Sequence, residues 1–276
     1  MEYNILLTTD FSANAWTATA YTLKLYAKEK CNFYFLNSID INAAMRSKYS
    51  SEVLKKMQED AKRLLLDLKA SAEKEHANPN HNFHTILSIN NLNKAVDNAI
   101  ETHHIDFVLM GAKGATGAKE FFVGGNTMRL INGLIKRPVL VVPEKPNFII
   151  PKQIGFLTDY NRSHSALEIE PLKKLVDLHH SKIAVVHIHK NEELNDTQQQ
   201  NQKNLRNHLA DYDYSLHWIP KLDNKSEKIN EFILEKGIDM LVLVNFKLSL
   251  IERIIKDPLI KKIGYEPIVP FLVIPE

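Results

Sequence analysis

The two halves of this chain carry the same series of apolar runs, and this repeat limits the folds that the chain can adopt. Residues 5–12 (Ile-Leu-Leu-Thr-Thr-Asp-Phe-Ser) return 149 residues later as residues 154–161 (Ile-Gly-Phe-Leu-Thr-Asp-Tyr-Asn). Residues 137–144 (Arg-Pro-Val-Leu-Val-Val-Pro-Glu) return 132 residues later as residues 269–276 (Val-Pro-Phe-Leu-Val-Ile-Pro-Glu). The sequence therefore predicts two tandem units of common ancestry, residues 1–146 and residues 147–276, of which the second is shorter.

Short apolar runs alternate with amphipathic stretches through the first half. Residues with helical spacing lie between runs that are typical of buried strands. The predicted strands are residues 4–9, 32–39, 83–87, 106–110 and 138–143. The predicted helices are residues 12–30, a long helix that runs through residues 53–68 and stops before Asn78, and residues 92–103 and 128–135. Strands that alternate with helices in this way predict the α/β class, with a parallel, doubly wound sheet in each half.

The composition is that of an ordinary globular protein and excludes several function classes. Of the 276 residues, 44% are hydrophobic and 25% are charged. A net charge of +2 is too small to predict the strongly basic surface that is typical of nucleic-acid-binding proteins. Cys31 is the single cysteine, so an intrachain disulfide is excluded. Because the chain shows neither a signal peptide nor a run of roughly 18 apolar residues, we expect a cytoplasmic protein with no membrane partner.

A glycine-rich stretch, residues 111–127, separates the fourth predicted strand from the next predicted helix. It holds five of the nine glycines in the chain. Glycine lets the backbone approach a ligand closely, and a helix N-terminus presents free N–H groups that favour an anion. A phosphate group would fit such a loop, although a flexible surface loop would have the same composition.

Two common phosphate-binding motifs do not fit this stretch. A Rossmann dinucleotide site needs glycines directly after the first strand, where this chain has Thr9-Asp10-Phe11-Ser12. A P-loop needs the pattern G-x-x-x-x-G-K-[ST], and no window of residues 111–119 matches it. What remains is the spacing Gly111-x2-Gly114-x9-Gly124 at the end of the fourth strand.

These motifs together resemble the universal stress protein family in its tandem, two-domain form. The resemblance rests on Asp10 after the first strand, on the spaced glycines, and on the closing strand of residues 137–143. It implies two tandem domains with the HUP-type nucleotide-binding fold. It also implies that ATP or AMP, with or without Mg²⁺, binds at the ends of strands one and four.

The resemblance further implies which residues hold the nucleotide. Asp10 would meet the adenosine part and the later glycines the phosphates. The full predicted set is Thr9, Asp10, Ser38, Met110, Gly111, Lys113, Gly114, Gly124, Gly125, Asn126 and Thr127. Gly125 departs from the family, which has Ser or Thr at that position, so Asn126 or Thr127 would have to replace the lost hydroxyl. Losing one neutral hydrogen bond weakens binding by about 0.5–1.5 kcal/mol.

The second half keeps the length of this loop but loses its glycines. Val244 and Lys247 stand where the first half has Gly111 and Gly114, and Asp257-Pro258 stands where it has Gly124-Gly125. Pro258 has no N–H to donate, and the Asp257 charge would repel a phosphate. We therefore expect one nucleotide site per chain, with Asp159 retained as a helix cap.

Other polar residues give no clear chemistry. The 12 histidines include His187-Ile-His189 and two adjacent pairs, but none completes a metal-ligand pattern. The polar run Gln198–Gln202 is interpreted as a solvated stretch near a helix start. No paired carboxylates or nucleophile–base pair can be placed beside the glycine stretch, so no catalytic residue is predicted.

Three functions remain open from the sequence. The first is a nucleotide-binding stress-response sensor or switch, the second an interaction scaffold that binds no nucleotide, and the third a slow ATPase. The family resemblance also implies that the two halves pair as an intramolecular pseudo-dimer through residues 139–142 and 271–274. Two copies of the whole chain could then form a homodimer.

Overall fold

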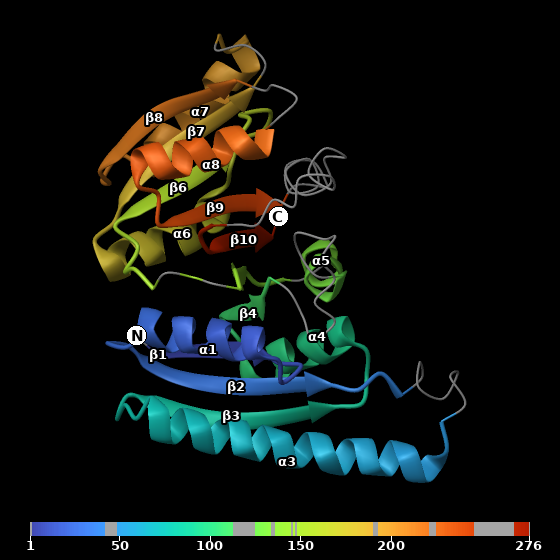
Figure 1. Cartoon of the computed structure of the whole chain (residues 1–276). Helices are drawn as coiled ribbons and strands as arrows, with labels where there is room; N and C mark the ends of the chain where they lie inside the picture. The colour runs from blue at the N-terminus through green and yellow to red at the C-terminus, as the bar shows by residue number, and fades with distance from the viewer. Residues whose placement is uncertain are drawn as a thin grey trace. The chain divides into compact units, whose positions relative to one another are not determined.

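The chain has an α/β fold in which parallel strands alternate with helices (Figure 1). We describe it from a computed structural model. The described residues are 2–41, 49–112, 125–133, 136–144, 146, 148–189, 193–220, 225–245 and 268–275. The predicted fold class is confirmed.

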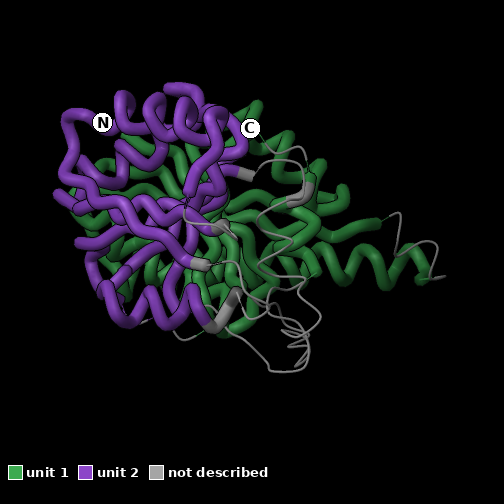
Figure 2. Tube along the Cα trace, turned by 90° about the horizontal axis from the view of Figure 1, so that it is seen from above, with its two compact units in different colours: residues 1–118, 123–145 green, residues 119–122, 146–276 purple. Residues whose placement is uncertain are grey.

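The chain divides into two compact units, coloured separately in Figure 2. Unit 1 comprises Met1–Ala118 and Val123–Lys145, and unit 2 comprises Lys119–Phe122 and Pro146–Glu276. The strand order in unit 1 is β3-β2-β1-β4-β5, and in unit 2 it is β10-β9-β6-β7-β8. All the strand pairs described within each unit are parallel.

The strands of unit 1 are β1 (Glu2–Thr8), β2 (Lys30–Ser38), β3 (His81–Ser88), β4 (Phe107–Gly111) and β5 (Val139–Val142). Its helices are α1 (Ala13–Leu25), α3 (Ser51–Glu75), α4 (Leu92–His103) and α5 (Gly125–Asn132). Right-handed crossovers with this strand order place α1 and α3 on one face of the sheet and α4 and α5 on the other. The order reverses between β1 and β4, so ligands of such a sheet bind at the carboxyl ends of these two strands.

Unit 2 repeats this plan. Its strands are β6 (Gln153–Thr158), β7 (Lys182–His189), β8 (Tyr214–Pro220), β9 (Met240–Asn245) and β10 (Phe271–Pro275). Its helices are α6 (Ala166–His179), α7 (Asp196–His208) and α8 (Lys225–Lys236).

The central strands are apolar on both faces because helices cover both sides of the sheet. Ile5, Leu6 and Leu7 of β1 are all fully buried. Of the helices α1 and α3, one differs in length from the prediction. The first helix ends at Leu25 rather than near residue 30, because β2 already begins at Lys30. The second helix, Ser51–Glu75, ends before Asn78, as predicted.

In each unit, an aspartate just before one strand accepts backbone hydrogen bonds from the start of the neighbouring strand. The Asp106 carboxylate, just before β4, accepts a hydrogen bond from the N–H of Asn4 in β1 (2.8 Å). In unit 2, Asp239 Oδ2 accepts hydrogen bonds from the N–H groups of Lys152 (2.8 Å) and Gln153 (3.0 Å). The matching sequence pairs Ile105-Asp106 and Ile238-Asp239 thus have the same structural role.

We expect Asp239→Ala to lower the unfolding free energy of unit 2 by about 2 kcal/mol, because two backbone donors lose a charged acceptor. The measurement is urea unfolding in a Trp16→Phe background, where Trp218 is the remaining tryptophan and reports on unit 2. Asp213→Ala is the control. It removes an exposed ion pair with Lys182 and should change stability by less than about 1 kcal/mol. Equal effects of the two substitutions would contradict this role for Asp239.

Candidate functional site

A tight turn follows β1 at the carboxyl edge of the sheet. The Thr9 hydroxyl accepts a hydrogen bond from the Phe11 N–H (3.0 Å), and Asp10 Oδ1 accepts one from the Ser12 N–H (3.1 Å). Ser12 then caps α1, because its side chain accepts a bond from the Ala15 N–H (3.2 Å). Phe11 has φ of 63°, a left-handed conformation that disfavours a residue with a Cβ by about 1–2 kcal/mol. Asp10 is thereby fixed at an exposed position at the end of the strand.

The same turn follows β6 in unit 2. The Thr158 hydroxyl accepts from the Tyr160 N–H (3.1 Å), Asp159 Oδ1 accepts from the Asn161 N–H (3.0 Å), and Tyr160 has φ of 53°. Asp159 therefore stabilises the turn, and the prediction that it caps a helix was wrong. The cap of α6 is Ser165, which forms a capping box with Glu168.

The pairing of β1 with β4 brings the predicted residues of these two strands together. Leu7 is in register with Leu109, and the Thr8 hydroxyl donates to the Leu109 carbonyl (2.9 Å). Thr9 and Asp10 therefore lie at the same edge as Met110 and Gly111. Thr9 and Met110 are buried, whereas Asp10 is exposed.

Gly111 is in close contact with the first turn of α1. A Cβ at this position would lie 2.8 Å from Asn14 Nδ2 and 3.2 Å from Asn14 Cγ. Because Asn14 occupies this space, packing against α1 accounts for the glycine without any ligand. The sequence interpretation had assigned Gly111 to ligand approach alone and missed Asn14.

Thr127 connects α5 to the end of β4. Its side chain is buried, and its hydroxyl donates to the Gly111 carbonyl (3.0 Å). Gly125 and Asn126 are exposed in the same first turn of α5, where backbone N–H groups have no partner within the helix. A Cβ at Gly125 would meet no atom within 4 Å among the described residues. None of the described residues therefore blocks the space beside Gly125.

The remaining predicted site residues fall into two groups. Ser38 ends β2 at the same edge of the sheet, and its hydroxyl donates to the Asn90 carbonyl (2.7 Å) before α4. Lys113, Gly114 and Gly124 lie outside the described residues.

In unit 2, side chains of α7 occupy the space beside the turn. Gln198 Nε2 donates to the Asp159 carbonyl (2.9 Å), and Asn201 Nδ2 donates to the Tyr160 carbonyl (2.8 Å). Both amides are buried, so the prediction that this polar run is solvated was wrong for these two residues. Their spacing of three residues, followed by Leu205, is the helical signal that could have revealed an inward face.

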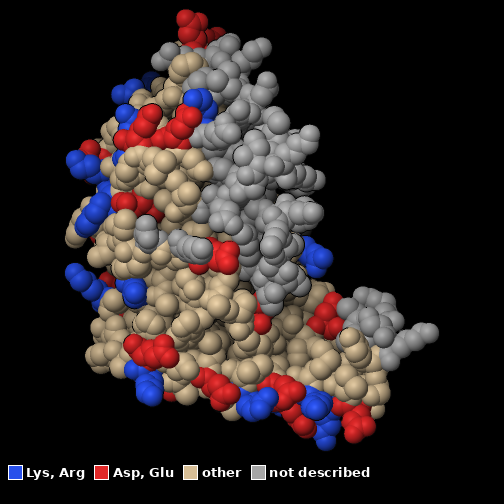
Figure 3. All heavy atoms as spheres, viewed as in Figure 1, with Lys and Arg blue, Asp and Glu red and all other residues tan. Residues whose placement is uncertain are grey.

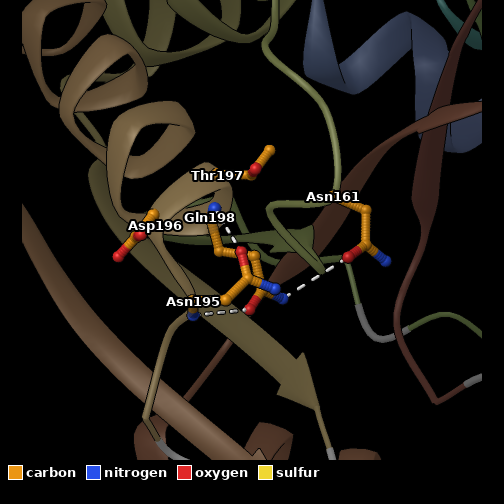
Figure 4. A pocket seen from close by; sticks show the side chains of 5 residues that line it. All are labelled: Asn161, Asn195, Asp196, Thr197 and Gln198. Atoms are coloured by element: carbon orange, nitrogen blue, oxygen red, sulfur yellow. Dashed lines mark hydrogen bonds between the residues drawn. The ribbon is translucent and has the colours of Figure 1, made fainter.

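A polar pocket of about 460 Å³ lies next to this turn, lined by Asn161, Asn195, Asp196, Thr197 and Gln198. Figure 4 shows that Gln198 is hydrogen-bonded to both Asn195 and Asn161. The polar side chains of the pocket thus bond largely to one another. Within the described part of the chain, no cluster of three His, Cys, Asp or Glu side chains could hold a metal ion.

His164 is a buried histidine close to the same turn. Its Nε2 lies 3.3 Å from the Thr158 hydroxyl, and His208 Nε2 donates to its carbonyl (3.0 Å). Burial lowers the pKa of His164 to about 4, and the positive charge of Arg162 acts in the same direction.

This geometry defines a class: a doubly wound α/β protein whose candidate ligand site lies at the sheet's switch point. The model of the family described as "Universal stress protein family" matches residues 2–143. The chain belongs to the universal stress protein family, as its motifs predicted. A search of curated proteins found no match. No described helix is long and apolar enough to cross a membrane.

Solved structures similar to this chain share its fold over the full length. A universal stress protein from Archaeoglobus fulgidus has a TM-score of 0.69 at 16% identity, covering 99% of this chain and 98% of that one. A functionally unknown protein from Pseudomonas aeruginosa PAO1 has a TM-score of 0.53 at 10% identity, covering 99% and 92%. The cytoplasmic domain of a prokaryotic cation chloride cotransporter has a TM-score of 0.53 at 10% identity, covering 99% and 95%.

We expect Thr127→Val to lower the unfolding free energy of unit 1 by about 1–2 kcal/mol, because the Gly111 carbonyl loses its hydroxyl donor in a part-buried site. Thr127→Ser keeps the hydroxyl and should retain most of the stability. Urea unfolding in a Trp218→Phe background, with Trp16 as the reporter for unit 1, measures both variants. A valine variant as stable as the parent would show that this bond does not hold α5.

His164 should make unit 2 sensitive to acid. The folded pKa of about 4 lies below the ordinary value of 6.5, so the unfolded state binds more protons between these values and stability falls as pH decreases. From pH 7 to pH 5 the loss due to His164 is about 2 kcal/mol. His164→Gln should remove this loss in urea unfolding at the two pH values. His180→Asn, at an exposed position, should leave it in place, and an unchanged pH dependence in H164Q would contradict the assignment.

Proposed function

We propose that unit 1 binds an adenine nucleotide, ATP or AMP, and that the protein acts through this site as a stress-response sensor or switch. Membership of the universal stress protein family supports the proposal. The observation that carries it is the juxtaposition of the Asp10 turn with the β4 end and the start of α5, at the switch point of the sheet.

The adenosine part would lie against the turn after β1. Asp10 is exposed there, and its position is fixed by the bond from the Ser12 N–H. A carboxylate in this place can accept hydrogen bonds from a ribose hydroxyl or an adenine amino group. Thr9 and Met110 would form the floor beside it.

The phosphates would lie against the start of α5 and the glycine stretch. The first turn of α5 offers backbone N–H groups and the positive end of the helix dipole. Gly125 leaves room for the phosphates but supplies no hydroxyl. The Thr127 hydroxyl already donates to Gly111, so the side-chain amide N–H groups of Asn126, whose Oδ1 accepts a bond from Arg129 (3.4 Å), would have to substitute. The roles of Lys113, Gly114 and Gly124 rest on the sequence motif.

Unit 2 would bind no nucleotide. Its turn carbonyls at Asp159 and Tyr160 already accept hydrogen bonds from the Gln198 and Asn201 amides. Its loop also lacks the glycines of the first half. One site per chain follows from both differences.

Isothermal titration with ATP, AMP and cyclic AMP tests this function, with the same turn of unit 2 as an internal control. Asp10→Asn keeps an acceptor for the Ser12 N–H but loses the charge, so we expect nucleotide affinity to fall about 10-fold or more. Asp159→Asn should leave affinity unchanged. Absence of binding to all three nucleotides, or an equal effect of D10N and D159N, would refute the proposed site.

A turnover assay separates binding from hydrolysis. Our proposal assigns no catalytic base or nucleophile, so phosphate release at saturating Mg-ATP should stay at the level of buffer alone. Release that is above background and lost in Asp10→Asn would instead identify the chain as an ATPase.

A further inference from the structure

β3 forms one end of the unit 1 sheet, and its outer edge has hydrogen-bonding groups to offer. Carbonyls of Asn80 and Ser88 accept bonds from β2 or the residue that follows it, at Cys31 and Ile39. Because successive peptide groups of a strand point to alternate sides, the N–H and C=O groups of Phe83, Thr85 and Leu87 face outward. No other strand in the described part of the chain pairs with this edge.

The β3 strand itself carries none of the residues that normally prevent a further strand from adding to a sheet. Exposed edges are usually protected by charged side chains, proline, bulges or short length, or by a covering helix or loop; α3 packs against β3, and its Lys69 and Glu73 line the groove beside the strand. β3 reads His-Asn-Phe-His-Thr-Ile-Leu-Ser, with no Lys, Arg, Asp, Glu or Pro, and it pairs in regular register with β2 over all eight residues. No residue of β3 itself therefore excludes a further strand.

A ladder of asparagine amides runs across the sheet and ends at this edge. Asn4, Asn32 and Asn82 are in register on β1, β2 and β3. Asn82 Nδ2 donates to Asn32 Oδ1 (3.1 Å), and Asn32 Nδ2 donates to Asn4 Oδ1 (2.9 Å). All these donors point inward, so the exposed end of the ladder is the Asn82 Oδ1 acceptor. Among the residues that the structure describes, no donor bonds to this atom.

A groove of about 550 Å³ lies beside the first half of β3. Its lining includes Lys69 and Glu73 of α3, Asn78, and Asn82, Phe83 and His84 of β3. The one cation and one carboxylate of this lining pair with each other (3.6 Å). Acidic and basic side chains are interspersed along α3, which is at the lower edge of Figure 3. The groove thus favours an uncharged occupant.

We propose that the outer edge of β3 binds an extended, uncharged segment of a partner protein. The segment adds a sixth strand to the unit 1 sheet, bonds to the outward groups of Phe83, Thr85 and Leu87, and places an Asn or Gln beside Asn82. The backbone ladder supplies affinity and the amide supplies selectivity, as in other cases of strand addition.

A second copy of the chain fits this edge less well. If two β3 strands pair antiparallel with Asn82 opposite Asn82, only His81–Phe83 of each copy overlap. A longer overlap of the two strands would place a different residue opposite Asn82. The amide ladder therefore favours a different polypeptide.

The probe is a fluorescein-labelled, capped peptide, Thr-Val-Thr-Asn-Thr-Val-Thr, with a matched peptide that has Val in place of Asn. Fluorescence anisotropy with the full chain should show binding of the Asn peptide below about 1 mM, and binding of the Val peptide at least about 3-fold weaker. Asn82→Val should remove this difference. An added strand bonds to the edge through every second N–H only. N-methylation of the N–H groups that face β3 should therefore abolish binding, and N-methylation of the alternate set should spare it.

Thr85→Pro removes one outward N–H without disturbing the bonds to β2, and should weaken the Asn peptide at least about 5-fold. The control is Leu216→Pro, at an outward position of β8, the edge strand of unit 2; it should have no effect. No binding of the Asn peptide, or equal loss in T85P and L216P, would overturn the proposal. Sedimentation that shows self-association lost only in T85P would also overturn it, because the occupant would then be a second copy. The N-methyl peptides decide the question if T85P does not fold.

Discussion

The parallel pairing of β1 with β4 is the contact on which the candidate site depends. It sets the register of Leu7 with Leu109 and is reinforced by the Thr8 hydroxyl, which donates to the Leu109 carbonyl. The strand order reverses here, so the helices after β1 and β4 lie on opposite faces and leave the strand ends open between them. The Asp10 turn and the start of α5 both take their positions from this pairing, and Thr127 fastens α5 to Gly111.

The same turn follows β1 in unit 1 and β6 in unit 2, but its surroundings differ between the two units. Each has a Thr-Asp pair that accepts backbone bonds and an aromatic residue, Phe11 or Tyr160, in the left-handed region. Such strained residues persist only where the surrounding structure fixes them, and they concentrate at functional sites. In unit 2 two buried amides of α7 bond to the turn. Both units therefore keep the same turn, while in unit 2 the carbonyls of Asp159 and Tyr160 are occupied by side-chain hydrogen bonds.

The alternation of apolar runs with helical spacing was enough to predict the α/β class, and three motifs predicted the family. Gln198 and Asn201 are buried amides on an otherwise polar helix, so hydrophobicity did not mark them, and only their helical spacing with Leu205 indicates an inward face. The sequence did not predict the left-handed conformation of Phe11, because that residue is aromatic rather than glycine. Gly111 was recognised as a position of close approach, but the sequence could not show that Asn14 occupies the space. The ladder Asn4–Asn32–Asn82 needed the strand register to become visible.

The central claim is that unit 1 binds nucleotide and unit 2 does not. Photolabelling of the full chain with 8-azido-ATP, followed by peptide mapping, tests this claim most directly. The account predicts label on peptides that contain Thr9–Ser12 or Met110–Thr127, competed by unlabelled ATP, and none on the peptide that contains Thr158–Asn161. Competable label on the unit 2 peptide, or equal label on both turns, would contradict it.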